Sequence, residues 1–225
     1  MIFSKQRLRE YPHQSAKPIC FDMSVAAITI TYNRLDLTKR TLDSFYSKTG
    51  VDYHLFIDNG STDGTQDYIK PRYDHIFLDD NYGITEAFCL AVSRLEGYDY
   101  ILKLDNDVET VTDDIIAKMV YFLDRQKRYA VSPVDLNLQP NFKPVTLNKF
   151  MVEGYRVEIA SHTGGAFQLA SSEVVKNLCA EYKSFKKGDY MIGHWYRRHG
   201  INPAYLLDLE MRHIGLGQST SNYIL

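Results

Sequence analysis

Three short polar clusters each follow a run of apolar residues, and they contain the side chains best suited to chemistry. Residues 31–34 are Thr-Tyr-Asn-Arg, residues 58–61 are Asp-Asn-Gly-Ser, and residues 105–107 are Asp-Asn-Asp. In an open α/β sheet, ligands bind at the carboxyl ends of the strands, where the loops come together. We therefore expect the three clusters to meet at one edge of a sheet.

The two carboxylates of the third cluster, Asp105 and Asp107, predict a metal and a phosphate-bearing substrate. They cannot both be desolvated without partners, because a buried unpaired charge is heavily penalised. Mg²⁺ or Mn²⁺ resolves this conflict, and such ions are usually held by one or two carboxylates together with substrate phosphates. The implied substrate is a nucleotide-diphosphate derivative. Neither G-x-x-x-x-G-K-[ST] nor G-x-G-x-x-G occurs, which excludes a P-loop and a dinucleotide fold.

The elements that must position these clusters alternate between strand and helix. Apolar β-branched runs predict strands, and apolar residues at helical spacing predict helices. The predicted strands are residues 25–31, 52–57, 75–78 and 100–104, and the predicted helices are residues 34–48, 61–69, 84–95 and 112–123. We expect Ser61 or Asp63 to cap the second helix and Thr112 or Asp113 to begin the fourth. This alternation indicates an α/β fold with a mostly parallel sheet covered by helices on both faces.

The alternation stops at about residue 135, so we expect a second, less regular lobe after it. Residues 1–22 are polar and mildly basic and are predicted to form an arm that leads into one domain, residues 23–225. No apolar run reaches the ~20 residues needed to span a bilayer. The three cysteines are far apart, the formal charge is -2, and no signal peptide is evident. We expect a cytoplasmic protein, either free or peripheral at a membrane.

Four stretches, in this order and spacing, resemble the GT-A glycosyltransferases of the large inverting group called family 2. They are ITITYNRLDLTKRTLDS from residue 28, FIDNGSTDGT from residue 56, NYG at residues 81–83 and LKLDNDVE from residue 102. The resemblance extends from Val25 to about Ser219. It implies a Rossmann-like sheet with a smaller acceptor-side lobe, divided into a nucleotide-sugar-binding half (23–135) and an acceptor and catalytic half (136–225).

The resemblance also implies roles for matching residues on the donor side. Asp58 would hydrogen-bond the base, most commonly uracil, Asp105 would lie near the ribose, and Asp107 would bind the metal. His213 would complete the metal site, and its imidazole favours Mn²⁺ somewhat over Mg²⁺. The remaining donor-binding residues would be Thr31, Tyr32, Asn33, Arg34, Asn81, Gly83 and Asn106.

On the acceptor side, the resemblance implies that Gly164 and Gly165 form a loop whose backbone approaches the sugar closely. Asp189 is the candidate general base, although Gly188 stands where family members carry a glutamate. Trp195 either stacks on a sugar ring or fills the core. The acceptor, a glycan, lipid-linked, protein or modified-nucleobase hydroxyl, stays open, and an inverting single-sugar transfer from a UDP-sugar is expected.

Two other functions are compatible with parts of the sequence. A haloacid-dehalogenase-type phosphatase would use Asp105 as nucleophile and Asp107 as acid/base, but it leaves DNGSTDGT unexplained. A non-catalytic protein of the same fold would bind nucleotide sugars or glycans, and Gly188 keeps this alternative open. A nucleotidyltransferase is disfavoured because TYNRLDL is not a glycine-rich basic loop.

Overall fold

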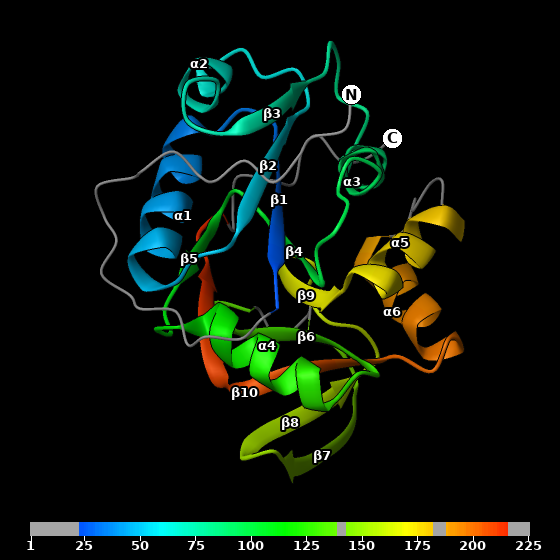
Figure 1. The fold of residues 1–225 in the computed structure, drawn as a ribbon. Coiled ribbons are helices and arrows are strands. Elements are labelled where there is room, and N and C mark those ends of the chain that lie inside the picture. The colour runs from blue at the N-terminus through cyan, green and yellow to red at the C-terminus, as the bar shows by residue number, and fades with distance from the viewer. Residues whose placement is uncertain (1–22, 139–142, 182–187, 216–225) are drawn as a thin grey trace.

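The computed structural model describes residues 23–138, 143–181 and 188–215, with the side chains of residues 188 and 189 left out of that description. These residues form one mixed β-sheet with helices on both faces, which confirms the α/β fold class (Figure 1). Strands of the sheet lie in the order β3-β2-β1-β4-β9-β6-β10-β8-β7, and β5 pairs with β10. No helix among the described residues is long and apolar enough to cross a membrane.

The first half of the chain builds the parallel part of the sheet, β3-β2-β1-β4. Its elements are β1 (Val25–Thr31), α1 (Leu35–Lys48), β2 (Tyr53–Asp58), α2 (Thr65–Ile69), β3 (Asp74–Phe77), α3 (Ile84–Val92), β4 (Tyr100–Leu104), β5 (Val108–Thr110) and α4 (Ile115–Arg125). The order follows the sequence prediction with shifted ends, except that β5 was not predicted. The N-cap residues of α2 and α4 are Gly64 and Asp114, both in the left-handed region of φ and ψ. None of the residues predicted to begin these helices takes the N-cap position.

The second half of the chain completes the same sheet. Its elements are β6 (Tyr129–Asp135), β7 (Thr146–Val152), β8 (Tyr155–Ala160), β9 (Phe167–Ser171), α5 (Ser172–Glu181), α6 (Gly188–Arg198) and β10 (Asn202–His213). Strand β9 lies antiparallel between β4 and β6. Strand β10 runs parallel to β6 and antiparallel to β8 and β5. The second half of the chain is therefore joined to the first half through backbone hydrogen bonds.

Alternation along β4 divides its side chains between the two faces of the sheet. Leu102 and Leu104 pack in the cluster that contains Phe45 of α1 and the buried face of α4. Ile101 packs in the opposite cluster, which contains residues of α3, α5 and α6. Figure 1 shows these last three helices together on one side of the sheet. Since successive strand residues point to opposite faces, Lys103 and Asp105 belong to the side of α3.

Two cysteines that are distant in the sequence meet where α3 packs on α5. Cys89 and Cys179 are both free thiols, half-buried in these helices. A hydrogen bond to Cys179 lowers the pKa of Cys89, and the same bond, with burial, raises the pKa of Cys179. Sequence spacing gave no sign of this pair, because the contact depends on the packing of two helices.

A buried histidine makes the stability of this fold depend on pH. His54 in β2 is 1% exposed, and its ring nitrogens lie 2.8 Å from Thr29 Oγ1 and 2.8 Å from Tyr46 Oη. Burial lowers the pKa of His54 from 6.5 to about 3. Between these values the unfolded chain binds a proton that the folded chain does not, so stability is lost as the pH falls below 6.5.

We expect the free energy of unfolding to fall by about 2 kcal/mol between pH 7 and pH 5 because of His54. Urea denaturation at the two pH values measures this difference. His54→Gln removes the titrating group and should flatten the dependence, whereas His75→Gln, which changes a partly buried histidine in β3, should retain it. An equal loss of stability in His54→Gln would contradict the assignment.

Candidate active site

A cavity of about 190 Å³ opens at the carboxyl ends of β1, β2 and β4, where the three polar clusters meet. Its lining contains most of the residues that the sequence predicted for the donor and metal sites. The lining residues are Ile30, Tyr32, Arg34, Asn59, Asn81, Ile84, Asp105, Asn106, Asp107 and His213. We call this cavity the donor pocket.

The loop after β1 directs Arg34 into the donor pocket through an unusual backbone. Asn33 and Arg34 have positive φ values of 58° and 63°, which cost energy in residues other than glycine. The second cluster holds this turn in place. Asn33 N donates to Ser61 Oγ at 2.7 Å, Thr62 N donates to Asn33 Oδ1 at 2.9 Å, and Leu35 N, at the start of α1, donates to Asp63 Oδ2 at 2.8 Å.

Asp58 lies beneath the donor pocket and is not part of its lining. It is 0% exposed, and its carboxylate accepts bonds from Thr31 Oγ1, from Gln66 Nε2, and from both the amide and the hydroxyl of Ser61. These internal bonds use both carboxylate oxygens, so Asp58 is not placed to meet a base. Its partner Thr31 is also 0% exposed. Both residues fix the loops instead.

The next residue, Asn59, lines the donor pocket and was not singled out by the sequence analysis. Its Nδ2 donates to the carbonyl of Gly83 at 3.4 Å. Its Oδ1 is buried and has no hydrogen-bond partner among the described residues. A buried acceptor without a partner is costly and calls for a ligand or water to satisfy it. Gly83 itself contributes this backbone contact at the start of α3 and does not line the pocket.

Asp107 is the central charge of the donor pocket. Its Oδ2 accepts a hydrogen bond from Arg34 Nη1 at 2.9 Å, and its Oδ1 lies 3.0 Å from His213 Nε2. Its side chain is 8% exposed, whereas those of Arg34 and His213 are 22% and 26% exposed. A charge desolvated to this degree requires such partners, so the three side chains form one unit.

The pairing of β5 with β10 explains how His213 reaches Asp107 from the other end of the chain. In that antiparallel pair His213 lies opposite Val108, the residue after Asp107. Ile214 N donates to the carbonyl of Asp107 at 2.8 Å. Glu109, which the sequence left without a role, contacts Arg212 across the same pair at 3.3 Å. The residues that follow the acidic cluster thus form strand β5, and its pairing with β10 brings His213 next to Asp107.

Charge and burial act in opposite directions on this unit. Burial by itself raises the pKa of Asp107, but the hydrogen bond and charge of His213, followed by the charges of Arg34 and Lys103, bring it below its usual value. Burial lowers the pKa of His213, but the hydrogen bond and charge of Asp107 outweigh it and raise that pKa. Together these shifts favour an ionised Asp107 beside a cationic imidazole when no metal is bound.

Asp105 and Asn106 are fixed by neighbouring elements. Asp105 forms an ion pair with Lys103 of β4. Asn106 is 9% exposed, and its Nδ2 donates to Thr38 Oγ1 of α1 at 3.1 Å. Asn106 therefore attaches the acidic cluster to α1, while Asp105 faces the other side of the sheet.

The residues predicted for the acceptor side are not all brought to one place. Gly165 accepts a hydrogen bond from Lys103 at 2.6 Å, and Gly164 N donates to Tyr205 Oη at 2.9 Å. Trp195 is 3% exposed and lies in the core, where its Nε1 donates to Glu181 at 2.7 Å and its ring stacks on His199. Trp195 is therefore a core residue, and the alternative that it stacks on a sugar is not supported.

Asp189 belongs to the first turn of α6, and its side chain lies outside the described residues. Helix α6 packs closely on the segment that leads to Gly164. A Cβ atom on Gly193 would lie 2.4 Å from the Cβ of His162 and 2.6 Å from the carbonyl of Ser161. Only glycine allows this approach, which places the backbone of α6 beside the acceptor-side loop.

A divalent cation fits the donor pocket at Asp107 and His213. Ligands ~2.1 Å from an octahedral ion lie about 3.0 Å from each other. The Oδ1 of Asp107 and the Nε2 of His213 are separated by 3.0 Å. No group of three acidic, histidine or cysteine side chains suited to a metal occurs among the described residues. The protein would thus supply two ligands, which suits an ion that shares its coordination with substrate phosphates.

Comparison with known proteins places the chain in a family. The model of the family described as glycosyl transferase family 2 matches residues 26–176, well over half of the chain. This match includes the three polar clusters, whereas Asp189 and His213 lie beyond it. No curated protein shows a significant match to the sequence.

Three solved structures share the fold. The mannosyltransferase PcManGT from Pyrobaculum calidifontis, in complex with GDP-Man and Mn²⁺, has a TM-score of 0.70 at 17% identity over 93% of this chain and 62% of its own. GalNAc-T7 with UDP, GalNAc and Mn²⁺ has a TM-score of 0.68 at 10% identity over 85% of this chain and 43% of its own. TarS 1–349 from S. aureus, in complex with UDP, has a TM-score of 0.63 at 15% identity over 84% and 60%.

This chain covers less than two thirds of the length of each of these structures. At such low identities the comparisons establish the shared fold, and the family follows from the sequence match. The mixed sheet, the three clusters at its carboxyl edge and the match over residues 26–176 lead to one conclusion: the chain belongs to glycosyl transferase family 2.

Proposed function

We propose that the protein transfers one sugar from a nucleotide-diphosphate sugar, with UDP as the expected nucleotide, to an acceptor hydroxyl with inversion. The observation that carries this proposal is the donor pocket itself. It combines an unpartnered amide oxygen on Asn59 with the Arg34, Asp107 and His213 unit. The amide oxygen of Asn59 can accept a hydrogen bond from a base. The unit of Arg34, Asp107 and His213 can hold a diphosphate through a metal ion and a guanidinium group.

In this proposal, Asp107 and His213 would hold Mn²⁺ or Mg²⁺, which would neutralise charge on the departing diphosphate. Arg34 is fixed against Asp107 and lines the same pocket, so it supplies a second positive charge there. Asn81 and Tyr32 line the pocket beside Asn59 and would contact the nucleoside. That three relatives of the same fold carry GDP-Man or UDP, two of them with Mn²⁺, supports a nucleotide donor.

The transfer needs one group to remove a proton. The acceptor oxygen attacks the anomeric carbon from the face opposite the diphosphate, and the bond from that carbon to the diphosphate oxygen breaks with its electron pair. The hydroxyl proton passes to a base, and we propose the carboxylate of Asp189 for this role. A positioned base of this kind contributes about 10² to 10⁴ in rate.

The structure counts against one of the two alternatives, and an assay must test the other. The phosphatase alternative required Asp105 as a free nucleophile, but Asp105 is ion-paired with Lys103 and the chain belongs to a glycosyltransferase family. A binder without turnover would use the same pocket, so only an assay of turnover separates it from an enzyme.

Replacement of Asn59 tests the base-binding side of the proposal. Asn59→Leu keeps a similar volume but removes the unpartnered acceptor, so the affinity for UDP should fall about tenfold, the value of roughly one hydrogen bond. Isothermal titration calorimetry with UDP and with GDP, each in the presence of Mn²⁺, measures the change. The proposal predicts that wild type prefers UDP.

The matched control is Asn148→Leu, at an exposed asparagine in the edge strand β7, which should leave UDP affinity unchanged. Undiminished UDP affinity in Asn59→Leu would remove Asn59 from the base site. Failure of wild type to bind either diphosphate would contradict the proposed function as a whole.

A further inference from the structure

Lys103 is an anomaly in its strand. Strand β4, with sequence YILKL, is buried at all five positions and lies between β1 and β9. Strands buried on both faces are normally continuous apolar runs. A lysine at such a position must have its charge compensated, because the cost of a buried unpaired ammonium is several kcal/mol. Lys103 does not line the donor pocket, although its charge helps to lower the pKa of Asp107 there.

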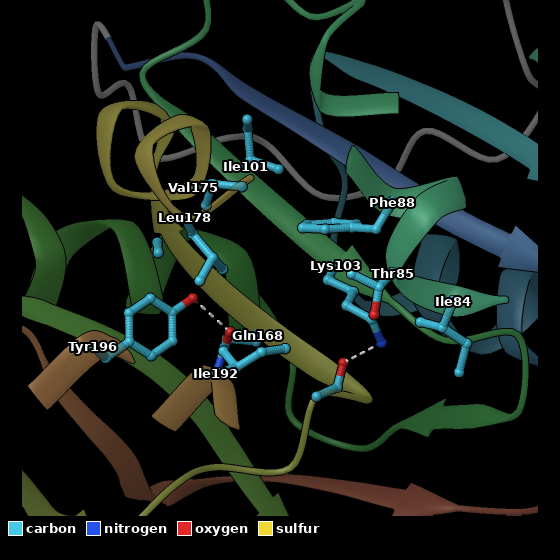
Figure 2. A pocket seen from close by; sticks show the side chains of 12 residues that line it. Ile84, Thr85, Phe88, Ile101, Lys103, Gln168, Val175, Leu178, Ile192 and Tyr196 are labelled. Atoms are coloured by element: carbon cyan, nitrogen blue, oxygen red, sulfur yellow. Dashed lines mark hydrogen bonds between the residues drawn. The ribbon is translucent and has the colours of Figure 1, made fainter. Parts of the chain in front are cut away.

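The ammonium of Lys103 contacts two groups that belong to opposite halves of the chain. It forms an ion pair with Asp105, two residues on and on the same side of β4. It also donates to the carbonyl of Gly165 at 2.6 Å. Figure 2 shows Lys103 extended toward this carbonyl from below α3. The donor-side acidic cluster and the acceptor-side loop are thus bonded to one side chain.

Lys103 also lies between two cavities. On one side is the donor pocket, which Asp105 lines. On the other is a small cavity of about 30 Å³ among α3, α5, α6, β4 and β9, lined by Lys103, Gly165, Phe88, Gln168, Leu178 and Tyr196 among others (Figure 2). Ile84 lines both cavities, so they are adjacent. The ion pair of Lys103 with Asp105 therefore forms part of the wall between them.

The backbone beneath this pair joins the same two segments. Asp105 N donates to the carbonyl of Ala166 at 2.7 Å, at the end of the β4–β9 ladder. Strand β9 comes from the second half of the chain, so this junction is where the acceptor-side loop meets the acidic cluster. Gly164 is held from the other side, because its N donates to Tyr205 Oη and its carbonyl accepts from Ser132 Oγ at 3.4 Å. The bond from Lys103 to Gly165 adds a side-chain contact that ties the same loop to the acidic cluster.

We propose that Lys103 is a positioning residue that holds the Gly164–Gly165 loop against the Asp105–Asp107 cluster, and so sets where the sugar end of the donor lies. This inference rests on the proposed function of the donor pocket and adds to it. Lys103 reaches the pocket that would hold base and diphosphate only through Asp105 and does not line it, so its loss should affect turnover more than nucleotide binding. A displacement of about 1 Å at such a site can cost about 10²-fold in rate.

The first test needs no substrate. In Lys103→Met, a replacement of similar length without charge, amide hydrogen exchange of Asp105 and of residues 164–166 should accelerate by about tenfold or more, because local opening becomes easier. The control Lys149→Met removes an ammonium from another largely buried carboxylate, Glu158 in the β7–β8 hairpin, and should leave these amides unchanged. Unchanged exchange in Lys103→Met would overturn the proposal.

The second test separates positioning from general destabilisation. Lys103→Met should lower kcat for hydrolysis of a UDP-sugar with Mn²⁺ by about 10- to 100-fold, while the Kd of UDP changes less than about threefold. The double variant Lys103→Met/Asp105→Asn removes both charges, so it provides a second measurement if a single variant does not fold. Its kcat should be no lower than that of the slower single variant. A parallel loss of UDP binding and kcat would overturn the assignment and indicate a structural role alone.

These measurements keep the two proposals apart. If wild type neither binds UDP nor hydrolyses any nucleotide sugar, the proposed function fails, while the exchange of Asp105 and residues 164–166 still decides whether Lys103 holds the loop. If wild type is active and exchange in Lys103→Met equals that of wild type, the function stands and the positioning role fails.

Discussion

Asp107→Asn is expected to lower the hydrolysis of a nucleotide-sugar donor by about 10³-fold, because metal-assisted charge stabilisation contributes several kcal/mol and each ~1.4 kcal/mol is tenfold. Asp107 is the shared partner of Arg34 and His213, so its charge organises the whole donor pocket. Asparagine keeps the shape of the aspartate side chain, but it has no negative charge with which to bind a metal ion or to pair with Arg34 and His213. Release of nucleoside diphosphate, followed by chromatography, measures the effect.

The control for this variant is Asp113→Asn. Asp113 forms an ion pair with Lys48 at 2.8 Å, but its side chain is 73% exposed, so the pair contributes little. Asp113→Asn should retain turnover within about twofold, since this ion pair is exposed to solvent and Asp113 does not line the pocket. Asp107→Asn should also abolish stabilisation by Mn²⁺ in a thermal melt. Turnover in Asp107→Asn within tenfold of wild type would contradict the role of Asp107.

Gly215→Ala is expected to reduce turnover by about 10²-fold through a single methyl group, because it misplaces the unit around Asp107. A Cβ atom on Gly215 would lie 2.1 Å from Asp107 Oδ2 and 2.8 Å from Asp107 Cγ. These distances are far below contact, so either the backbone after His213 or the carboxylate must move. Either shift disturbs the carboxylate of Asp107, whose Oδ2 pairs with Arg34 at 2.9 Å and whose Oδ1 lies 3.0 Å from His213 Nε2.

The matched control is Gly50→Ala, because a Cβ atom there would meet nothing within 4 Å. Gly50→Ala should match wild type in turnover and in Mn²⁺ affinity. Gly215→Ala should bind Mn²⁺ more weakly in calorimetry, in parallel with its loss of turnover. The added methyl group overpacks this site, so the variant should also lose about 1–3 kcal/mol of stability. Unaltered Mn²⁺ affinity in Gly215→Ala would show that the segment after β10 does not shape the metal site.

The parallel part of the fold could be predicted because its signals are local. Runs such as VAAITIT and YILKL are long enough to identify strands, and the helices between them carry regular apolar spacing. The second half could not be predicted in the same way. Strand β9 pairs with β4 across a long stretch of chain, and β10 bonds to β5, β6 and β8 at once. Partner choice of this kind depends on packing, which periodicity does not encode.

The meeting of the three polar clusters at one edge of the sheet could be predicted, because polar residues at strand ends converge in an open α/β sheet. The roles of single residues were harder to predict. Asp58 is the last residue of β2 and Asn59 follows it; both side chains are buried, but only Asn59 lines the pocket. Lys103 was missed because it lies inside an apolar run. Gly215 gave no signal, because its role is the close approach of two distant segments.

The most direct test of the central claim is turnover of a panel of nucleotide sugars with Mn²⁺ by wild type and by Asp107→Asn. UDP-glucose, UDP-N-acetylglucosamine, UDP-galactose and GDP-mannose would be incubated separately, and release of the nucleoside diphosphate recorded. The proposed function predicts that wild type releases UDP from at least one UDP-sugar and that Asp107→Asn does not. Tight binding of UDP without release from any donor, or equal release by Asp107→Asn, would contradict it.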